Sequence, residues 1–231
     1  NGTGTFVYMA ALDSNTLVVI DVEDPTQPEL VAAISDATNM DGPSGVAASP
    51  LGDIIFVTGR YTDSVAAIDV SDPTAPIIVG AVSDSTNMIS PADLIVSADG
   101  NYAYVAGVTS DSLTVLDVSD PTQPTVVGYI SGDTTNLNGA HSVGLSPDGK
   151  YVYVTGAVGD SVAIVDVSDP TSPVVAGAIV GDSTNMNTPL GLTVDPVGKY
   201  VYVVGRDSHS FAVVDVQSPS DPVVVGSIVG N

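Results

Sequence analysis

The chain has 231 residues, of which 44% are hydrophobic, and 27 acidic against 4 basic residues give it a formal net charge of −23. This length can bury the core of one ordinary domain, and the charge repels nucleic-acid phosphates and anionic lipid headgroups. We therefore expect no nucleic-acid partner and, because no apolar run approaches the roughly 20 residues of a bilayer span, no membrane insertion. The absence of cysteine excludes disulfides and thiol chemistry.

An internal repeat organises the whole sequence. A short apolar run that ends in Asp-Val recurs, and after each Asp a proline follows at the fourth and at the seventh position. The anchor aspartates are spaced by 48, 48, 49 and 49 residues and stand at Asp21, Asp69, Asp117, Asp166 and Asp215. A fixed period of this length is typical of repeat architectures.

Each repeat contains apolar stretches rich in Val, Ile and Tyr, separated by clusters of Gly, Pro, Asp and Ser. In the fourth repeat this pattern predicts strand A at residues 142–146, strand B at 151–155, strand C at 161–166 and strand D at 173–180. Four short antiparallel strands in 48 to 49 residues form a propeller blade. We predict an all-β, five-bladed β-propeller that is one domain over residues 1–231, with repeats at about 1–36, 37–84, 85–133, 134–182 and 183–231.

Two motifs connect these repeats to known families. The runs at residues 17–21 and 162–166 resemble the LVIVD repeat, and residues 56–59 and 153–156 resemble the YVTN repeat, with Gly in place of its Asn. The resemblance implies a β-propeller and an extracellular or cell-surface location, as in surface-layer proteins. Lactonase-type enzymes share the broader architecture.

The first repeat is incomplete. It begins directly at strand B, because residues 6–9 align with residues 151–154, so the first blade is predicted to lack its innermost strand A. The sequence leaves three explanations open: a truncated array, a blade of three strands, or a strand that a partner adds to the open edge. The chain starts at Asn1 with no signal-like segment, so we expect that any secretion signal has been removed or never existed.

The loops from strand D to the next strand A repeat almost verbatim. Their carboxylates and amides are oxygen ligands of the kind that Ca²⁺ takes, although they lack the dense acidic spacing of a dedicated calcium loop. The alternative is that they form turns that satisfy the loop backbone, while the hydrophobic residue closing each loop (Met40, Met88, Leu137 or Met186) plugs the blade. We favour the structural role and no bound cofactor, and keep as candidate calcium or ligand residues Asp36, Asn39, Asp84, Asn87, Asp133, Asn136, Asp182 and Asn185.

Residues that break the repeat are the other candidates for function. Asp93 and His141 stand near the start of strand A in two neighbouring repeats, and His209 lies in a B-to-C loop where other repeats carry Asn or Asp. We predict that these three residues approach the mouth of the central channel. No catalytic motif accompanies them, so we assign no catalytic residue and expect that the chain is not an enzyme.

A low density of charge is the best functional signal in the composition, because charged residues make up only 13% of the chain. Such a surface is suited to being covered by copies of the same protein. We therefore expect an extracellular structural propeller that packs with itself in a layer, sheath or filament. The alternatives are a module that binds calcium or a glycan through its acidic loop face, and a lactonase-like hydrolase.

Overall fold

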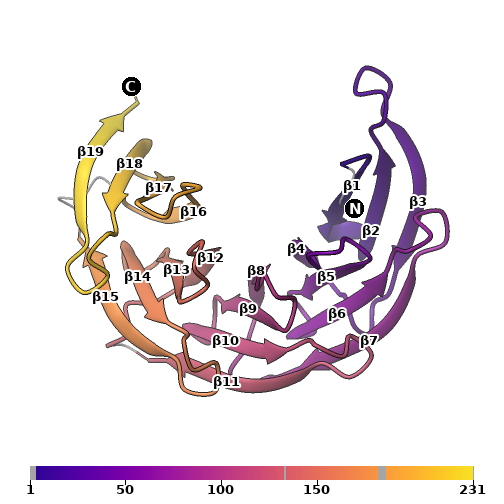
Figure 1. The fold of residues 1–231 in the computed structure, drawn as a ribbon, viewed down its shortest axis with the longest axis horizontal. Coiled ribbons are helices and arrows are strands. Elements are labelled where there is room, and N and C mark those ends of the chain that lie inside the picture. The colour runs from indigo at the N-terminus through magenta and orange to yellow at the C-terminus, as the bar shows by residue number, and fades with distance from the viewer. Residues whose placement is uncertain (1–3, 133, 182–185, 231) are drawn as a thin grey trace.

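A computed structural model describes residues 4–132, 134–181 and 186–230, and the fold of this part is all-β. Five antiparallel sheets lie side by side in an arc, and the first and last blades form its two ends (Figure 1). The predicted propeller of five repeats is confirmed. Each blade holds one repeat, and its strands are hydrogen-bonded to one another in chain order.

The strand bounds follow the repeat closely. Blade 1 contains β1 (Phe6–Ala11), β2 (Thr16–Asp21) and β3 (Glu29–Ser35). Blade 2 contains β4 (Pro43–Ala48), β5 (Ile54–Gly59), β6 (Ser64–Asp69) and β7 (Ile77–Ser83). Blade 3 contains β8 (Pro91–Val96), β9 (Tyr102–Gly107), β10 (Ser112–Asp117) and β11 (Thr125–Ser131).

The last two blades repeat the same plan. Blade 4 contains β12 (Ala140–Leu145), β13 (Tyr151–Gly156), β14 (Ser161–Asp166) and β15 (Val174–Val180). Blade 5 contains β16 (Pro189–Val194), β17 (Tyr200–Gly205), β18 (Ser210–Asp215) and β19 (Val223–Val229). The helix η1 (Leu12–Ser14) is a single 3-10 turn, and no helix in the described ranges has the length and apolarity that crossing a membrane requires.

Blade 4 tests the predicted strand boundaries. Strand C is found where it was predicted, and strand B extends one residue further, to Gly156. Strand A starts two residues early and ends one residue early, at Ala140–Leu145, and strand D starts at Val174, after the proline. The early start of strand A carries a register shift between Ala140 and Val143. Sequence alternation does not reveal such a bulge, because the extra residue pairs with nothing.

The first sheet has three strands in the order β1-β2-β3, which confirms that the innermost strand of blade 1 is absent from the described chain. In the four complete blades the inner edge is formed by β4, β8, β12 and β16, which line the concave side of the arc (Figure 1). Strand β1 instead forms the inner edge of its own sheet. No described strand of that sheet pairs with its inner side.

The anchor aspartates close the turn after strand C, as the repetition predicts. In every blade the carboxylate accepts a hydrogen bond from the backbone N–H two residues later, at 2.8 to 3.0 Å. The two prolines that follow have no N–H to satisfy, so they fit the turn without cost. These five aspartates therefore serve the blade, which explains why every repeat carries one.

The core is a series of clusters between blades, because the residues of strands B and C point alternately to the preceding and to the following blade. The hydrophobic residue that closes each D-to-A loop is fully buried in these clusters, which confirms its predicted role as a plug. The third position of strand B carries an aromatic ring in every repeat. The rings are Tyr8, Phe56, Tyr104, Tyr153 and Tyr202.

Tyr8 offers a test of this packing. Its hydroxyl is buried without a hydrogen-bond partner among the described residues, and burial raises the pKa of this phenol. Because Phe56 fills the equivalent position of blade 2, Tyr8→Phe should raise the free energy of unfolding by about 1 kcal/mol, the typical cost of an unsatisfied polar group. Urea denaturation measures this change. The exposed Tyr61→Phe is the control, and an equal gain there would contradict the explanation.

Candidate functional site

The candidate residues of the D-to-A loops are occupied with holding the loops together. The Asp36 carboxylate accepts hydrogen bonds from the backbone N–H of Thr38 at 2.6 Å and from the Asn39 side chain at 2.9 Å. Asp84 binds the backbone N–H of Thr86 and the side chain of Asn87 in the same way, at 2.8 and 2.9 Å. These are the Asx turns of the structural interpretation.

The acidity of these aspartates fits that role. The hydrogen bond from the Asn39 side chain, together with those from the loop backbone, lowers the pKa of Asp36 below its usual value. No group of three metal-binding side chains occurs among the described residues. Asn136 has a left-handed backbone with φ of 59°, and its carbonyl accepts a bond from Ser161 at 2.8 Å. Asp133, Asp182 and Asn185 lie outside the described residues.

The B-to-C loops fasten each blade to the next. One Asn or Asp in each of the first four loops adopts a left-handed backbone, which these two residue types tolerate. Its side chain accepts a hydrogen bond from the backbone N–H of the residue directly before strand A of the following blade, at 2.7 to 3.0 Å. The four residues are Asn15, Asp63, Asp111 and Asp160.

His209 occupies the same position in blade 5. Its backbone is left-handed, with φ of 48°, and its carbonyl accepts a bond from Gly230 at 2.7 Å. The side chain is exposed at the end of the arc, beside the ion pair between Arg206 and Asp207 at 2.9 Å. His209 therefore belongs to the open end of blade 5 and not to a cluster with Asp93 and His141.

Asp93 bridges two inner strands. Its carboxylate accepts hydrogen bonds from the hydroxyl of Ser142 at 2.9 Å and from the backbone N–H of Val143 at 3.1 Å, both in blade 4. It also accepts a bond from the N–H of Leu94 at 2.9 Å. The Asp93 carboxylate thus links blades 3 and 4 by hydrogen bonds on the concave side of the arc.

His141 forms a similar hydrogen bond across the next junction, between blades 4 and 5. Its Nδ1 donates to the carbonyl of Leu190 in blade 5 at 3.0 Å, and this contact places the ring proton on Nδ1. Ser44 in blade 2 likewise donates to the carbonyls of Pro91 and Ala92 in blade 3. Asp93 and His141 each bind the following blade, so the two predicted channel residues do not form an acid–base pair with each other.

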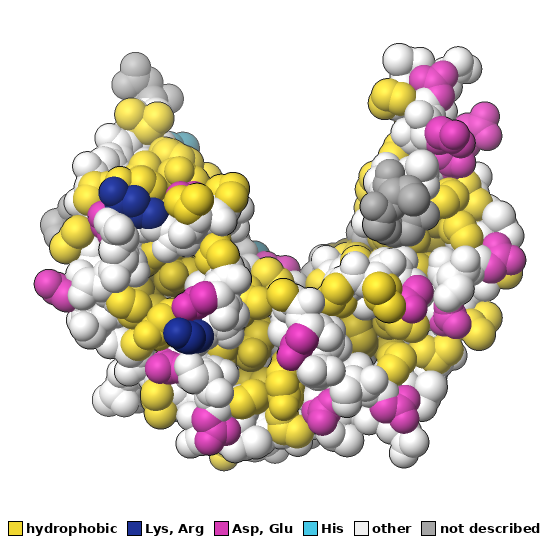
Figure 2. All heavy atoms as spheres, viewed as in Figure 1, with side chains coloured by type: hydrophobic (Ala, Val, Ile, Leu, Met, Phe, Trp, Pro, Cys, Tyr) yellow, Lys and Arg dark blue, Asp and Glu magenta, His cyan; other side chains and the backbone are white. Residues whose placement is uncertain are grey.

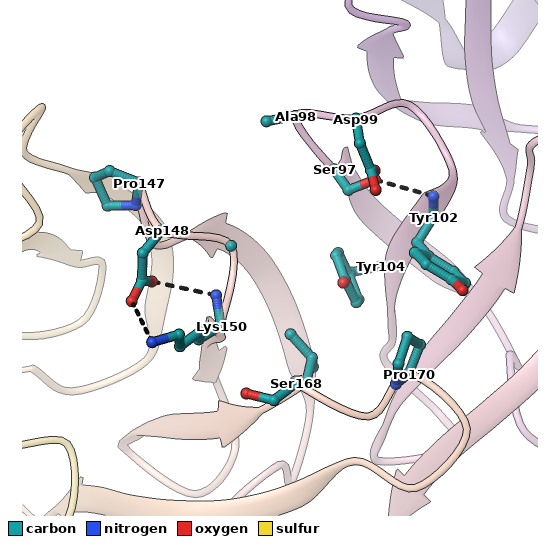
Figure 3. A pocket seen from close by; sticks show the side chains of 12 residues that line it. Ser97, Ala98, Asp99, Tyr102, Tyr104, Pro147, Asp148, Lys150, Ser168 and Pro170 are labelled. Carbon is teal, nitrogen blue, oxygen red and sulfur yellow. Dashed lines mark hydrogen bonds and ion pairs between the residues drawn. The ribbon is translucent and has the colours of Figure 1, made fainter.

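A cleft between blades 3 and 4 opens on the opposite face, at the A-to-B turns. Its volume is about 450 Å³, and Figure 3 shows Tyr104 between the two walls. One wall carries Asp99 and Tyr102, and the other carries the turn of Asp148 with Lys150, whose ammonium lies 3.7 Å from that carboxylate.

Equivalent clefts lie at two further junctions. The cleft between blades 2 and 3 has a volume of about 500 Å³ and contains Phe56, and the one between blades 4 and 5 has about 270 Å³ and contains Tyr153. The sequence analysis missed this face, because it treated the D-to-A and B-to-C loops as the working surface. The repeated aromatic residue of strand B was the signal that pointed to it.

The two ends of the arc expose the blade faces that are buried elsewhere. At the C-terminal end these are Phe211, stacked on Tyr202 with ring centres 5.9 Å apart, and Ile228. At the N-terminal end they are Val7 and Met9 of β1. Figure 2 shows hydrophobic side chains on both arms of the arc, among scattered acidic ones.

Comparison with known protein families shows to which family this chain belongs. The sequence profile of the lactonases with a seven-bladed β-propeller matches residues 94–222, more than half of the chain. The chain belongs to this lactonase propeller family. The LVIVD repeat also matches, at residues 3–36 and 59–84, which confirms the resemblance found in the sequence.

Solved structures show the same fold at low sequence identity. The periplasmic gluconolactonase of Pseudomonas aeruginosa superposes with a TM-score of 0.82 at 17% identity, covering 98% of this chain and 68% of its own. A proposed 6-phosphogluconolactonase from Bacteroides uniformis gives a TM-score of 0.82 at 22% identity, covering 99% and 69%. A protein from Lactobacillus plantarum gives 0.83 at 19%, covering 97% and 68%. No curated protein matches the chain.

Proposed function

We propose that this chain is a scaffolding propeller of the extracellular space or cell surface that associates with further copies of itself through its two open blade faces. One observation carries this proposal. Side-chain positions that are buried at the internal blade junctions are exposed at the two ends of the arc, and they are hydrophobic there as well.

The exposed fractions show the difference. Val201 and Val203 of blade 5 pack on blade 4 and are 0% exposed, whereas the equivalent Val7 and Met9 of blade 1 are 46% and 48% exposed. Burying a side chain of this kind stabilises a contact by about 1.5–3 kcal/mol. The incoming face of blade 1 is therefore ready to pack on another blade.

The outgoing face of blade 5 is its counterpart. Val162 and Ile179 of blade 4 are 1% and 8% exposed, whereas the equivalent Phe211 and Ile228 are 37% and 70% exposed. Because each internal junction joins an outgoing face to an incoming face, blade 5 of one copy is complementary to blade 1 of the next.

This contact is heterologous, since it joins two different surfaces. A heterologous contact forms a ring where its repeated rotation closes and a helical filament where it does not. We expect each successive copy to be displaced along the axis of the assembly, so that the copies form a filament or sheath. The unpaired inner edge of β1 offers a further joint, at which a neighbouring strand adds to the sheet.

Light scattering and electron microscopy across a concentration series test the proposal. The mass is expected to grow with concentration, and more steeply at 0.5 M salt than at about 0.05 M, because salt screens the repulsion between copies of net charge −23. Monomers at every concentration and salt level would overturn it.

Hydrolysis of a sugar lactone is the second candidate, and the family match to lactonases favours it. In that case His141, on the concave side, would hold a substrate oxygen or move a proton through its ring nitrogen that does not bind Leu190. Turnover of glucono-δ-lactone that is lost in His141→Asn and kept in His209→Asn would support this function. A rate equal to the uncatalysed one would exclude it for this substrate.

A further inference from the structure

The cleft between blades 3 and 4 is lined by Tyr104, whose hydroxyl makes no hydrogen bond within the described fold. The Tyr104 side chain is only 2% exposed. This hydroxyl is not shut off from solvent, so water or a ligand in the cleft is its available partner. Phe56 at the equivalent position of blade 2 shows that the packing itself needs only the ring.

The groups around Tyr104 supply both donors and acceptors. Burial, with a smaller contribution from Asp99, raises the pKa of Tyr104 to about 12, so its hydroxyl keeps its proton and donates. Hydrogen bonds from Ser97 and Ser146 lower the pKa of Asp99 and Asp148 respectively, so both carboxylates stay ionised at neutral pH and accept. These carboxylates come from two different blades and face one cleft (Figure 3).

The walls of the cleft also carry apolar surface. Tyr102 presents a half-buried ring, and Pro147 and Pro170 line the other side. An aromatic ring packs well on a flat face of C–H groups, while closely spaced acceptors and donors suit a molecule with many hydroxyls. A volume of about 450 Å³ lies in the ordinary range of small-molecule sites.

Charge narrows the class of ligand. Two carboxylates face the cleft and its one ammonium, Lys150, is already paired with Asp148, in a chain whose net charge is −23. An anion is repelled by such a site. We propose that the cleft between blades 3 and 4 binds a neutral saccharide, whose ring packs on Tyr102 while its hydroxyls bind Tyr104, Asp99 and Asp148.

The repeat extends this site along the face of the arc. The cleft between blades 4 and 5 also holds a tyrosine, Tyr153, but it is smaller, and the one between blades 2 and 3 carries Phe56 without a hydroxyl. We therefore expect blades 3 and 4 to form the principal site. Weak sites on one rigid face would act together on a repeating polysaccharide, because the second contact is intramolecular.

Saturation-transfer NMR on the whole chain, with the methyl glycosides of glucose, galactose and mannose as probes, tests the proposal. At least one probe is expected to receive magnetisation. The variant that carries both Tyr104→Phe and Tyr153→Phe should bind it roughly 3- to 10-fold more weakly, the usual effect of losing one hydrogen bond. Both tyrosines are changed so that the smaller cleft between blades 4 and 5 cannot replace the hydrogen bond that the principal cleft has lost.

Two controls separate binding in the cleft from other causes. Tyr61→Phe removes an exposed hydroxyl from a B-to-C loop and should leave binding unchanged. Ser168→Tyr, at an exposed position of the lining, should block the principal cleft without touching the core. The proposal is overturned if no probe binds, if the double variant and Ser168→Tyr both bind as the parent chain does, or if glucuronic acid binds more tightly than the neutral glycosides.

Discussion

Phe211→Asp is expected to abolish the association of this chain with itself. Phe211 lies on the exposed outgoing face of blade 5, stacked on Tyr202, at a position where the equivalent Val162 is buried against the next blade. A carboxylate there loses the burial of the ring and must be desolvated when a second copy docks. The dissociation constant should rise at least about 100-fold, which analytical ultracentrifugation measures.

Three further variants test whether the exposed blade faces, and not the added charge, cause this loss of association. Ile228→Asp on the same face and Met9→Asp on the incoming face of blade 1 should have effects of the same sign. Val197→Asp adds the same charge to blade 5 at an exposed turn away from the face, and should leave association almost unchanged. If Val197→Asp disrupts association as strongly as Phe211→Asp, net charge and not the blade face controls assembly.

Met88→Ala is expected to produce a large loss of stability. The Met88 side chain is fully buried in the cluster that joins blades 2 and 3, against Phe56 and Leu94. Removing it leaves a cavity that a junction of two rigid sheets cannot close, which costs about 3 kcal/mol of the free energy of unfolding. Chemical denaturation followed by circular dichroism measures this loss.

The equivalent residue of the next repeat suggests a conservative variant that should keep most of the stability. Met88→Leu should cost less than about 1.5 kcal/mol, because Leu137 occupies the equivalent position of the next blade with full burial. Leu51→Ala at an exposed turn should have almost no effect. A loss in Met88→Ala no larger than that in Leu51→Ala would show that the loop plug does not hold the blades together.

Much of the candidate site could be anticipated from turn chemistry. Asp69, one of the anchor aspartates of the repeat, accepts a hydrogen bond from the N–H of Ser71 in the turn that follows, at 2.8 Å. The structure also pairs Asp36 with Thr38 and Asn39 inside one loop, as the structural interpretation of that loop requires. Such contacts span two or three residues, so the local sequence is enough to predict them.

Contacts between blades could not be predicted from local turn chemistry. Asp93 and His141 were placed near the channel by their position in the repeat, but their partners, Ser142 and Leu190, lie 49 residues further along the chain. A sequence without an alignment of relatives does not show which backbone group lies opposite a side chain across a junction. The same is true of the Tyr104 cleft, whose walls come from two repeats.

Strand alternation and turn residues act within one repeat, so the amino-acid sequence is enough to predict the all-β fold, the period, the five blades and the missing strand of blade 1. Which faces of the blades are covered is visible only in the folded molecule. Equivalent residues such as Val203 and Met9 are alike in character, yet one is buried and the other is exposed. Burial depends on the presence of a neighbouring blade, and packing between repeats is a property of the arc as a whole.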